Sequence, residues 1–172
     1  RGFSKENMGP PPIESALAGR LNSEGESILY LSDSEETTLY EVRACMGDFV
    51  TIGSFKLKED IEVINISLLD KISPYQGISN GFDFTQYAIN IEHLRMICGE
   101  ISKPQRKHDK LLDYVPTQYI SDFIKSRLYC GIEFHSTICS HGSNFAIFES
   151  CLFTCTKVKT TCVTSIVYSY SG

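Results

Sequence analysis

The order of β-rich and amphipathic stretches is the feature that most restricts the fold of this chain. Runs of apolar and β-branched residues predict strands, and apolar residues three or four positions apart predict helices. One predicted strand precedes the first predicted helix, two follow it, and three follow the last helix. This order lacks the regular alternation of a doubly wound fold, so the sequence predicts an α+β domain with a mixed sheet and about three helices.

Six segments have the alternation or clustering of β-favouring residues that predicts strands. They span residues 28–31, 49–56, 61–66, 131–135, 145–148 and 157–170. Two further segments are predicted to connect elements, because 73–81 is rich in turn-forming residues and 103–109 is charged.

Three segments have the period of a helix. The first is predicted to have Asp33 as its N-cap, with Glu36 at the capping-box position, and to end at Gly47. Its apolar stripe consists of Leu39, Val42 and Met46. The second spans residues 84–99, and the third begins near Pro116, which the first turn of a helix accepts. The apolar positions of the third are Tyr119, Ile120, Phe123 and Ile124.

The chain has 172 residues, the size of one globular domain. Hydrophobic residues make up 42% and charged residues 22%, which excludes a disordered chain or a coiled coil. No apolar run approaches the roughly 18 residues that cross a bilayer, so we expect no membrane association. We expect a single domain over residues 1–172. Because the first residue is Arg1 and not Met, we expect this domain to be the C-terminal part of a longer chain.

The balance of charge argues against nucleic acid as a direct partner. Lys and Arg total 16 and Asp and Glu total 21, a net charge of -5. Proteins that neutralise nucleic-acid phosphates carry a basic excess or a basic stripe, whereas the densest basic stretch here, 103–110, is interrupted by Pro104 and Asp109. An anionic ligand would therefore be held by a few placed arginines.

The seven cysteines do not form the dense framework of a small disulfide-rich scaffold. They are expected to be reduced thiols, which is typical of a cytoplasmic protein. One group of candidate metal ligands lies close in the sequence: His135, Cys139, His141, Cys151 and Cys155. Structural zinc sites usually have paired short spacings such as Cys-x-x-Cys, which this group lacks, so no metal site is expected.

Common signatures of nucleotide and hydrolase sites are absent, with one exception. Residues 77–81 match the Gly-x-Ser-x-Gly pattern of a nucleophile elbow, with Ser79 as the nucleophile. That motif requires a buried strand before it, and residues 73–76, which contain Pro74, form a poor strand. We therefore interpret the segment as a turn.

Glu41 is the most informative single candidate because of its helical neighbours. The residues three and four positions away on the predicted helix are Thr37, Thr38, Ala44 and Cys45. None of them is Lys or Arg, so Glu41 does not belong to a solvated ion-pair face. A carboxylate on a small, uncharged helix face suggests room for a ligand, although an exposed glutamate is the simpler interpretation.

Three further polar residues are weaker candidates. Arg20 follows an Ala-Gly pair in a coil that permits close approach of the backbone, which suits a guanidinium that clamps phosphate; a surface arginine is the ordinary interpretation. Tyr30 lies in the strand before Glu41 and would ordinarily be a core tyrosine. Ser136 ends a strand and opens a polar loop.

Three groups of segments resemble the RES domain family, and together they span nearly the whole chain. The first contains GPPP at 9–12 and AGRLN at 18–22. The second contains LYLS at 29–32, TT at 37–38 and EVR at 41–43. The third contains DYVPTQ at 113–118, GIEFHS at 131–136 and NFAIF at 144–148. The resemblance is specific because the order, the spacing and the flanking residues agree.

The resemblance implies a set of site residues and a fold. Arg20, Glu41 and Ser136 match the Arg, Glu and Ser that give the family its name, and Tyr30 matches a functional tyrosine. Known relatives are toxins of bacterial toxin-antitoxin pairs that consume NAD, and their fold is similar to that of ADP-ribosyltransferases. The Pro-rich opening resembles the subfamily with an extra N-terminal region.

By this resemblance, the expected activity is cleavage of the nicotinamide-ribose bond of NAD by hydrolysis or phosphorolysis. Glu41 is then expected to act on the ribose and Arg20 to bind the phosphates. Tyr30 is expected to position the nicotinamide end, and Ser136 to donate to phosphate or ribose. NAD is thus the expected substrate, and neither a cofactor nor a metal is expected, because nicotinamide departs as a neutral group.

The resemblance also implies partners and leaves two alternatives open. The expected partners are NAD, inorganic phosphate as an acceptor, a helix-turn-helix antitoxin and a second copy of the chain in a homo-oligomer. One alternative is ADP-ribosylation of a protein target. The other is a non-catalytic interaction module whose pocket has decayed, which the cysteine-rich surface segments suggest.

Overall fold

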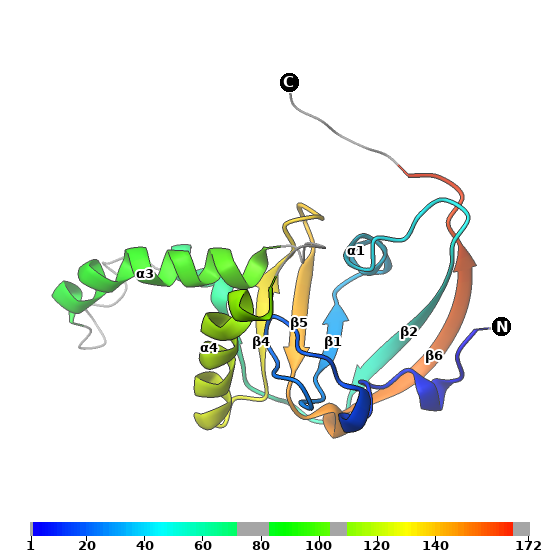
Figure 1. Ribbon diagram of the computed structural model, residues 1–172, viewed down its shortest axis with the longest axis horizontal. Helices are drawn as coiled ribbons and strands as arrows, with labels where there is room; N and C mark the ends of the chain where they lie inside the picture. Colours follow the sequence, from blue (N-terminus) through cyan, green and yellow to red (C-terminus); the bar gives the residue numbers. More distant parts are fainter. Residues whose placement is uncertain (1, 72–82, 104–109, 167–172) are drawn as a thin grey trace.

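The computed structural model describes residues 2–71, 83–103 and 110–166. Figure 1 shows a central sheet with two long helices on one side of the molecule and a two-stranded ribbon on the other. The described residues contain three α-helices and a mixed sheet, which confirms the α+β prediction. In the same part of the chain, no helix is long and apolar enough to span a bilayer.

The central sheet has the strand order β1, β5, β4, β3. These strands span Leu29–Ser32, Ser143–Ile147, Gly131–His135 and Val63–Asn65, respectively. β3 runs parallel to β4, and the other two pairs are antiparallel. β1 is therefore an edge strand, and its outer edge faces the ribbon (Figure 1).

The ribbon consists of β2 (Phe49–Leu57) and β6 (Phe153–Cys162). Its antiparallel register runs from Phe49 opposite Cys162 to Leu57 opposite Phe153. Short 3-10 turns join the longer elements: η1 (Lys5–Asn7), η2 (Ile13–Ser15), η3 (Ile66–Lys71), η5 (Leu111–Tyr114) and η6 (Ser150–Leu152).

The hydrophobic core lies between the central sheet and two helices, α3 (Phe84–Ser102) and α4 (Val115–Ser126), which both contact β4. Its buried members are Leu21, Ile28, Ile66, Cys98, Ile101, Ile124, Ile132 and Ala146. Ile132 of β4 is 0% exposed. The core therefore fixes the sheet that carries the side chains described below.

α1 spans Glu35–Glu41, so the predicted N-cap, Asp33, lies one residue too early. Ser34 is the N-cap, and its hydroxyl accepts the backbone N–H of Thr37. Asp33 has a different task, because its carboxylate accepts the hydroxyl of Thr37 and the backbone N–H of Ser143. Asp33 thus ties α1 to β5.

The predicted end of the first helix at Gly47 is also wrong. Arg43 has a φ of 52°, a left-handed conformation that ends an α-helix soon after Glu41. The predicted apolar stripe is therefore not formed, since Val42 and Met46 are exposed. The buried residue of this helix is Thr37.

The other elements follow the predictions with shifted ends. The strand expected at 61–66 shortens to β3 because η3 begins at Ile66. The strand expected at 157–170 begins earlier, as β6, because it pairs along β2, and its last part, 167–170, lies outside the described residues. The turn predicted at 73–81, with Ser79, lies outside the described residues, as does the linker 103–109 beyond Lys103.

α4 differs from the prediction in the face that it buries. Tyr119 and Phe123, predicted as apolar contacts, are exposed. The buried residues are Thr117, Ser121 and Ile124, so much of the inner face is polar. The reason is that the hydroxyls of Thr117 and Ser121 donate to backbone carbonyls of the loop at residues 19–22.

Candidate active site

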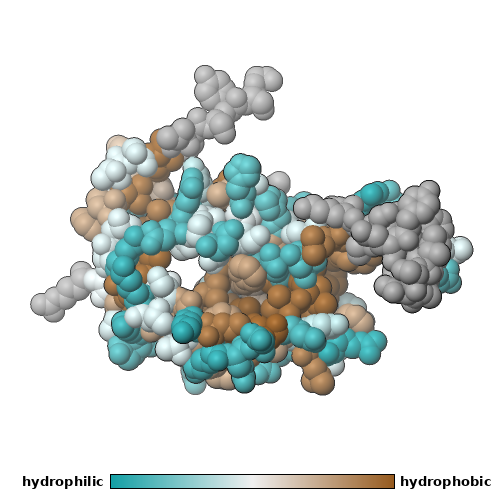
Figure 2. Space-filling model, turned by 180° about the vertical axis from the view of Figure 1, so that it is seen from behind, coloured by the Kyte–Doolittle hydropathy of each residue, from teal (hydrophilic) through white to brown (hydrophobic). Residues whose placement is uncertain are grey.

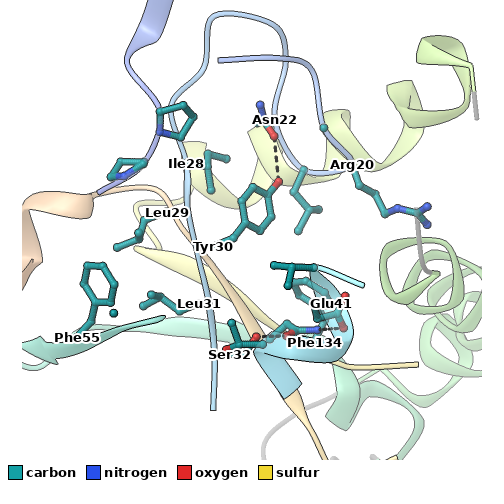
Figure 3. A pocket seen from close by; sticks show the side chains of 18 of the residues that line it. Arg20, Asn22, Ile28, Leu29, Tyr30, Leu31, Ser32, Glu41, Phe55 and Phe134 are labelled. Carbon is teal, nitrogen blue, oxygen red and sulfur yellow. Dashed lines mark hydrogen bonds between the residues drawn. The ribbon is translucent and has the colours of Figure 1, made fainter. Parts of the chain in front are cut away.

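A cleft with a volume of about 920 Å³ opens between β1, β2, the N-terminal loop and α1. This volume is at the large end of the roughly 300–1,000 Å³ typical of ligand sites. Three of the four predicted site residues line it: Arg20, Tyr30 and Glu41 (Figure 3). The fourth, Ser136, is 1% exposed and lies behind Glu41.

The carboxylate of Glu41 is held on one oxygen only. Its Oε1 accepts the Ser136 hydroxyl at 2.6 Å and the Asn144 side-chain amide at 2.7 Å. Two donors occupy the two lone pairs of that oxygen. No donor in the described part of the chain bonds Oε2, so the second oxygen of Glu41 is available to a ligand in the cleft.

The position of Glu41 in the chain is not one that stabilises the helix. It is the last residue of α1, where the helix dipole places partial negative charge and favours a cation over a carboxylate. Donors from β5 and from the loop after β4 compensate for this placement. The position of this carboxylate therefore depends on tertiary contacts and not on the helix that carries it.

Ser136 holds the loop after β4 and points its hydroxyl proton at Glu41. Its Oγ accepts the backbone N–H groups of Ile138 and Cys139 at 3.3 and 3.0 Å. A serine hydroxyl has one donor and two acceptor sites, and all three are therefore used. This differs from the expected donation to phosphate or ribose, because the hydroxyl proton of Ser136 is directed to Glu41.

The loop that carries Arg20 is held by the inner face of α4. Thr117, Gln118 and Ser121 donate to all four backbone carbonyls of residues 19–22, at distances of 2.5 to 2.9 Å. The side-chain amide of Gln118 donates to two of these carbonyls, those of Gly19 and Asn22. The polar part of the α4 inner face therefore fixes the path of the loop beside the cleft.

The basic side chains that line the cleft gather at the C-terminal end of α3. Arg20 donates to the backbone carbonyl of Glu100 at 2.6 Å, and its guanidinium lies 5.5 Å from the centre of the Tyr114 ring. Lys103 forms an ion pair with the side chain of Glu100. These two residues are the basic ones among the described residues on the cleft wall, so they mark its cationic end.

Tyr30 presents its ring to the cleft and turns its hydroxyl into the 19–22 loop (Figure 3). The hydroxyl donates to Asn22 Oδ1 at 3.0 Å. Although 48% of the residue is exposed, burial of the hydroxyl end raises the pKa of Tyr30 to about 12, against a lowering contribution from the Leu21 backbone. Tyr30 is therefore a neutral donor at physiological pH.

We expect the stabilising contribution of the Tyr30 hydroxyl to disappear in alkali. Because its pKa is higher in the folded protein than the ordinary value of 10.0, the contribution is complete below pH 10 and is lost between pH 10 and 12. The free energy of unfolding in urea, measured for the wild type and Tyr30→Phe from pH 7 to 11, should differ by a constant amount up to pH 10 and by less above it. A difference that changes well below the ordinary pKa of tyrosine would contradict this assignment.

The outer edge of β1 offers unpaired backbone groups beside the cleft. The Asp33 N–H donates to the Ser143 carbonyl, and this register makes every second residue of β1 bond to β5. The backbone groups of Tyr30 and Ser32 fall between these positions and point away from β5. No other described strand pairs with this edge, so it offers both donors and acceptors to a ligand.

The remaining candidates from the sequence do not converge. Among the described residues, no three His, Cys, Asp or Glu side chains are grouped as a metal site. None of the seven cysteines forms a disulfide bond in this part of the chain. The group from His135 to Cys155 therefore gives no geometry that a metal ion would use.

Comparison with known proteins shows the family of the chain. A family model described as RES domain matches residues 3–167, nearly the whole chain. The chain belongs to the RES domain family. RES domains are known in NAD-related toxin-antitoxin systems. No curated protein and no solved structure matches this RES domain, so its expected likeness to ADP-ribosyltransferases stays a prediction.

The site of this RES domain also contains residues that the sequence did not reveal. Asn144 and Ser32 complete the hydrogen bonds behind Glu41, and Asn22 and Gln118 hold the loop next to Tyr30. Their only sequence signal was a place inside or near the segments that resemble the family. Polar residues that bond across the fold have no local periodicity that would single them out.

Proposed function

We propose that this RES domain cleaves the nicotinamide-ribose bond of NAD by hydrolysis or phosphorolysis. The observation that carries the proposal is the carboxylate of Glu41, with one oxygen held by two donors and the other available at the cleft. Cleavage moves the bonding electron pair from ribose C1′ to the ring nitrogen, so nicotinamide leaves neutral and positive charge develops on the ribose. A fixed carboxylate stabilises this charge.

The two ends of the cleft suit the two kinds of group in a dinucleotide, its flat bases and its charged pyrophosphate. In Figure 3, Phe55 and Leu29 lie at one end and Arg20 at the other. Apolar and aromatic side chains provide a surface for a flat base. Arg20 and Lys103 supply the positive charge that a pyrophosphate needs in a chain with net negative charge. This bipolar lining supports NAD over a small sugar or a purely apolar ligand.

The nicotinamide end is proposed to bind between Tyr30 and the edge of β1. The exposed ring of Tyr30 offers a stacking surface. The outward backbone groups of Tyr30 and Ser32 match the donor and acceptor of a carboxamide. This placement brings the adjacent ribose toward Glu41, which lines the same cleft.

The acceptor completes the reaction. Water or a phosphate oxygen attacks C1′, forms the new bond to carbon and loses its proton to solvent. ADP-ribose is the product with water, and ADP-ribose 1″-phosphate is the product with phosphate. Both products balance the release of one nicotinamide for each NAD consumed.

We expect the purified chain to release nicotinamide from NAD in an amount equal to the NAD lost. Chromatography of reactions with and without inorganic phosphate identifies the product, and a requirement for phosphate indicates phosphorolysis. Labelled NAD that tags a protein in lysate would instead favour the alternative of protein ADP-ribosylation. Absence of nicotinamide release, together with no NAD binding by calorimetry, would contradict the proposal and favour an interaction module.

A protein partner belongs to the proposal, because an enzyme that drains NAD must be restrained in its host. We propose a helix-turn-helix antitoxin as that partner. On the face shown in Figure 2, hydrophobic residues gather near the middle and hydrophilic residues border them. Surfaces of this kind often mark protein interaction sites. Large apolar side chains are also exposed along η5 and α4: Leu111, Leu112, Val115, Tyr119 and Phe123.

A further inference from the structure

We infer that Asn144, oriented by Ser32, is a positioning residue that fixes the carboxylate of Glu41 and determines which of its oxygens faces the substrate. The inference rests on the proposed function of Glu41 as the group that stabilises the ribose. It adds that full activity requires an amide donor at position 144, which the proposed function alone does not predict.

The strand register brings Ser32 and Asn144 together. Ser32 of β1 lies directly opposite Asn144 of β5, in a pair that does not exchange backbone hydrogen bonds. In such pairs the strands are closest, and the two side chains leave the sheet on the same face. The Ser32 hydroxyl donates to Asn144 Oδ1 at 2.7 Å.

This contact determines the orientation of the Asn144 amide. Because Oδ1 accepts from Ser32, the Nδ2 group points the other way and donates to Glu41 Oε1 at 2.7 Å. Asn144 is only 5% exposed, so water does not compete freely for this amide. A hydrogen-bonded chain therefore runs from β1 through β5 to the end of α1.

Ser136 alone would not fix the carboxylate. One hydrogen bond leaves a glutamate free to rotate about its last torsion, whereas two bonds from different elements define the plane of the group. The second bond comes from Asn144 and belongs to the rigid central sheet, while Ser136 lies in a loop. With Oε1 fully used, Oε2 is preorganised toward the cleft, which lowers the cost of reaching the reactive geometry.

An aspartate in place of Asn144 would have the same shape and the opposite effect. Two carboxylates at this separation do not both ionise easily, so one proton is shared and the pair titrates at a higher pH than a lone carboxylate. When protonated, the introduced carboxyl group can donate to Glu41 as the amide does. Asn144→Asp should therefore be impaired at neutral pH and recover as the pH falls.

The test compares pH profiles of nicotinamide release for the wild type, Asn144→Asp and Ser32→Ala. At pH 7 we expect kcat of Asn144→Asp to fall about 10- to 100-fold, as for loss of a hydrogen bond to a charged group, with a smaller change in KM. Ser32→Ala, which keeps the amide but not its orientation, should lose less activity. The matched control is Asn65→Asp, because Asn65 caps the Ser67 N–H with its oxygen outside the cleft and the variant keeps that acceptor.

A profile of Asn144→Asp with the same shape as the wild type would overturn the inference. A second readout does not depend on activity: carbon NMR of labelled glutamate carboxylates, with the Glu41 signal assigned by its loss in Glu41→Gln. In Asn144→Asp this signal should titrate at a higher pH than in the wild type, and an unchanged titration would also overturn the inference. If the wild type releases no nicotinamide, the proposed function fails while the NMR comparison still decides whether Asn144 contacts Glu41.

Discussion

Glu41→Gln should reduce the kcat of nicotinamide release by about 100- to 1,000-fold, the size of effect seen when one preorganised electrostatic group is removed from an active site. The amide oxygen of glutamine can still accept from Ser136 and Asn144, so the hydrogen bonds that hold the side chain are kept. What the variant loses is the negative charge beside the ribose. NAD turnover under saturating substrate measures the effect.

Glu36→Gln is the matched control for this experiment. Glu36 lies on the same helix but is exposed and does not line the cleft. Its replacement should leave kcat within about twofold, because Glu36 does not reach the substrate. The effect on helix stability should also be small, since a first-turn carboxylate stabilises a helix by about 0.3–1 kcal/mol. If Glu41→Gln were as active as Glu36→Gln, the charge of Glu41 would have no role in the reaction.

Ile132→Ala should destabilise the folded protein by about 2–5 kcal/mol. Ile132 is 0% exposed and belongs to the core between β4 and the two long helices, so the substitution leaves a cavity that the packed neighbours cannot fill. This loss is a large share of the roughly 5–15 kcal/mol that stabilises an ordinary domain. Urea unfolding followed by circular dichroism measures it.

Ile89→Ala removes the same atoms from an exposed position on α3, where Ile89 is 61% exposed. It should change the free energy of unfolding by less than about 0.5 kcal/mol, as most surface substitutions do. Equal losses in the two variants would mean that Ile132 does not lie at the centre of the core.

The sequence predicted the types of most elements because their signals are local. The apolar period from residue 84 predicted α3, and the proline near the start of α4 marked its first turn. The alternation at 49–56 predicted β2. These patterns arise from side chains a few positions apart, so one sequence is enough to read them.

The ends of α1 were not predictable, because they depend on partners far away in the chain. Asp33 has the form of an N-cap, but its carboxylate bonds to the backbone of Ser143, which lies 110 positions later. The stop at Glu41 depends on the left-handed backbone of Arg43, and arginine gives no sign of that conformation. The predicted boundaries followed local rules that long-range contacts overrode.

The candidate site was predictable in part. Glu41 stood out because its helical neighbours carry no Lys or Arg, and the structure places it on the cleft wall. Asn144 was missed, because a lone polar residue in a strand has meaning only when the register puts it opposite Ser32, 112 positions away. The direction of the Ser136 hydroxyl, toward Glu41 and not toward a ligand, likewise depends on tertiary structure.

The hydrogen bonds from α4 to residues 19–22 affect how the sequence of this loop can evolve. The helix bonds to main-chain carbonyls, which every amino acid possesses. The support that α4 gives the loop is therefore independent of the side chain at position 20, whereas Asn22 also holds the loop with its own side chain. Selection can exchange the side chain displayed to a ligand at position 20 without altering the bonds from α4 that hold the main chain.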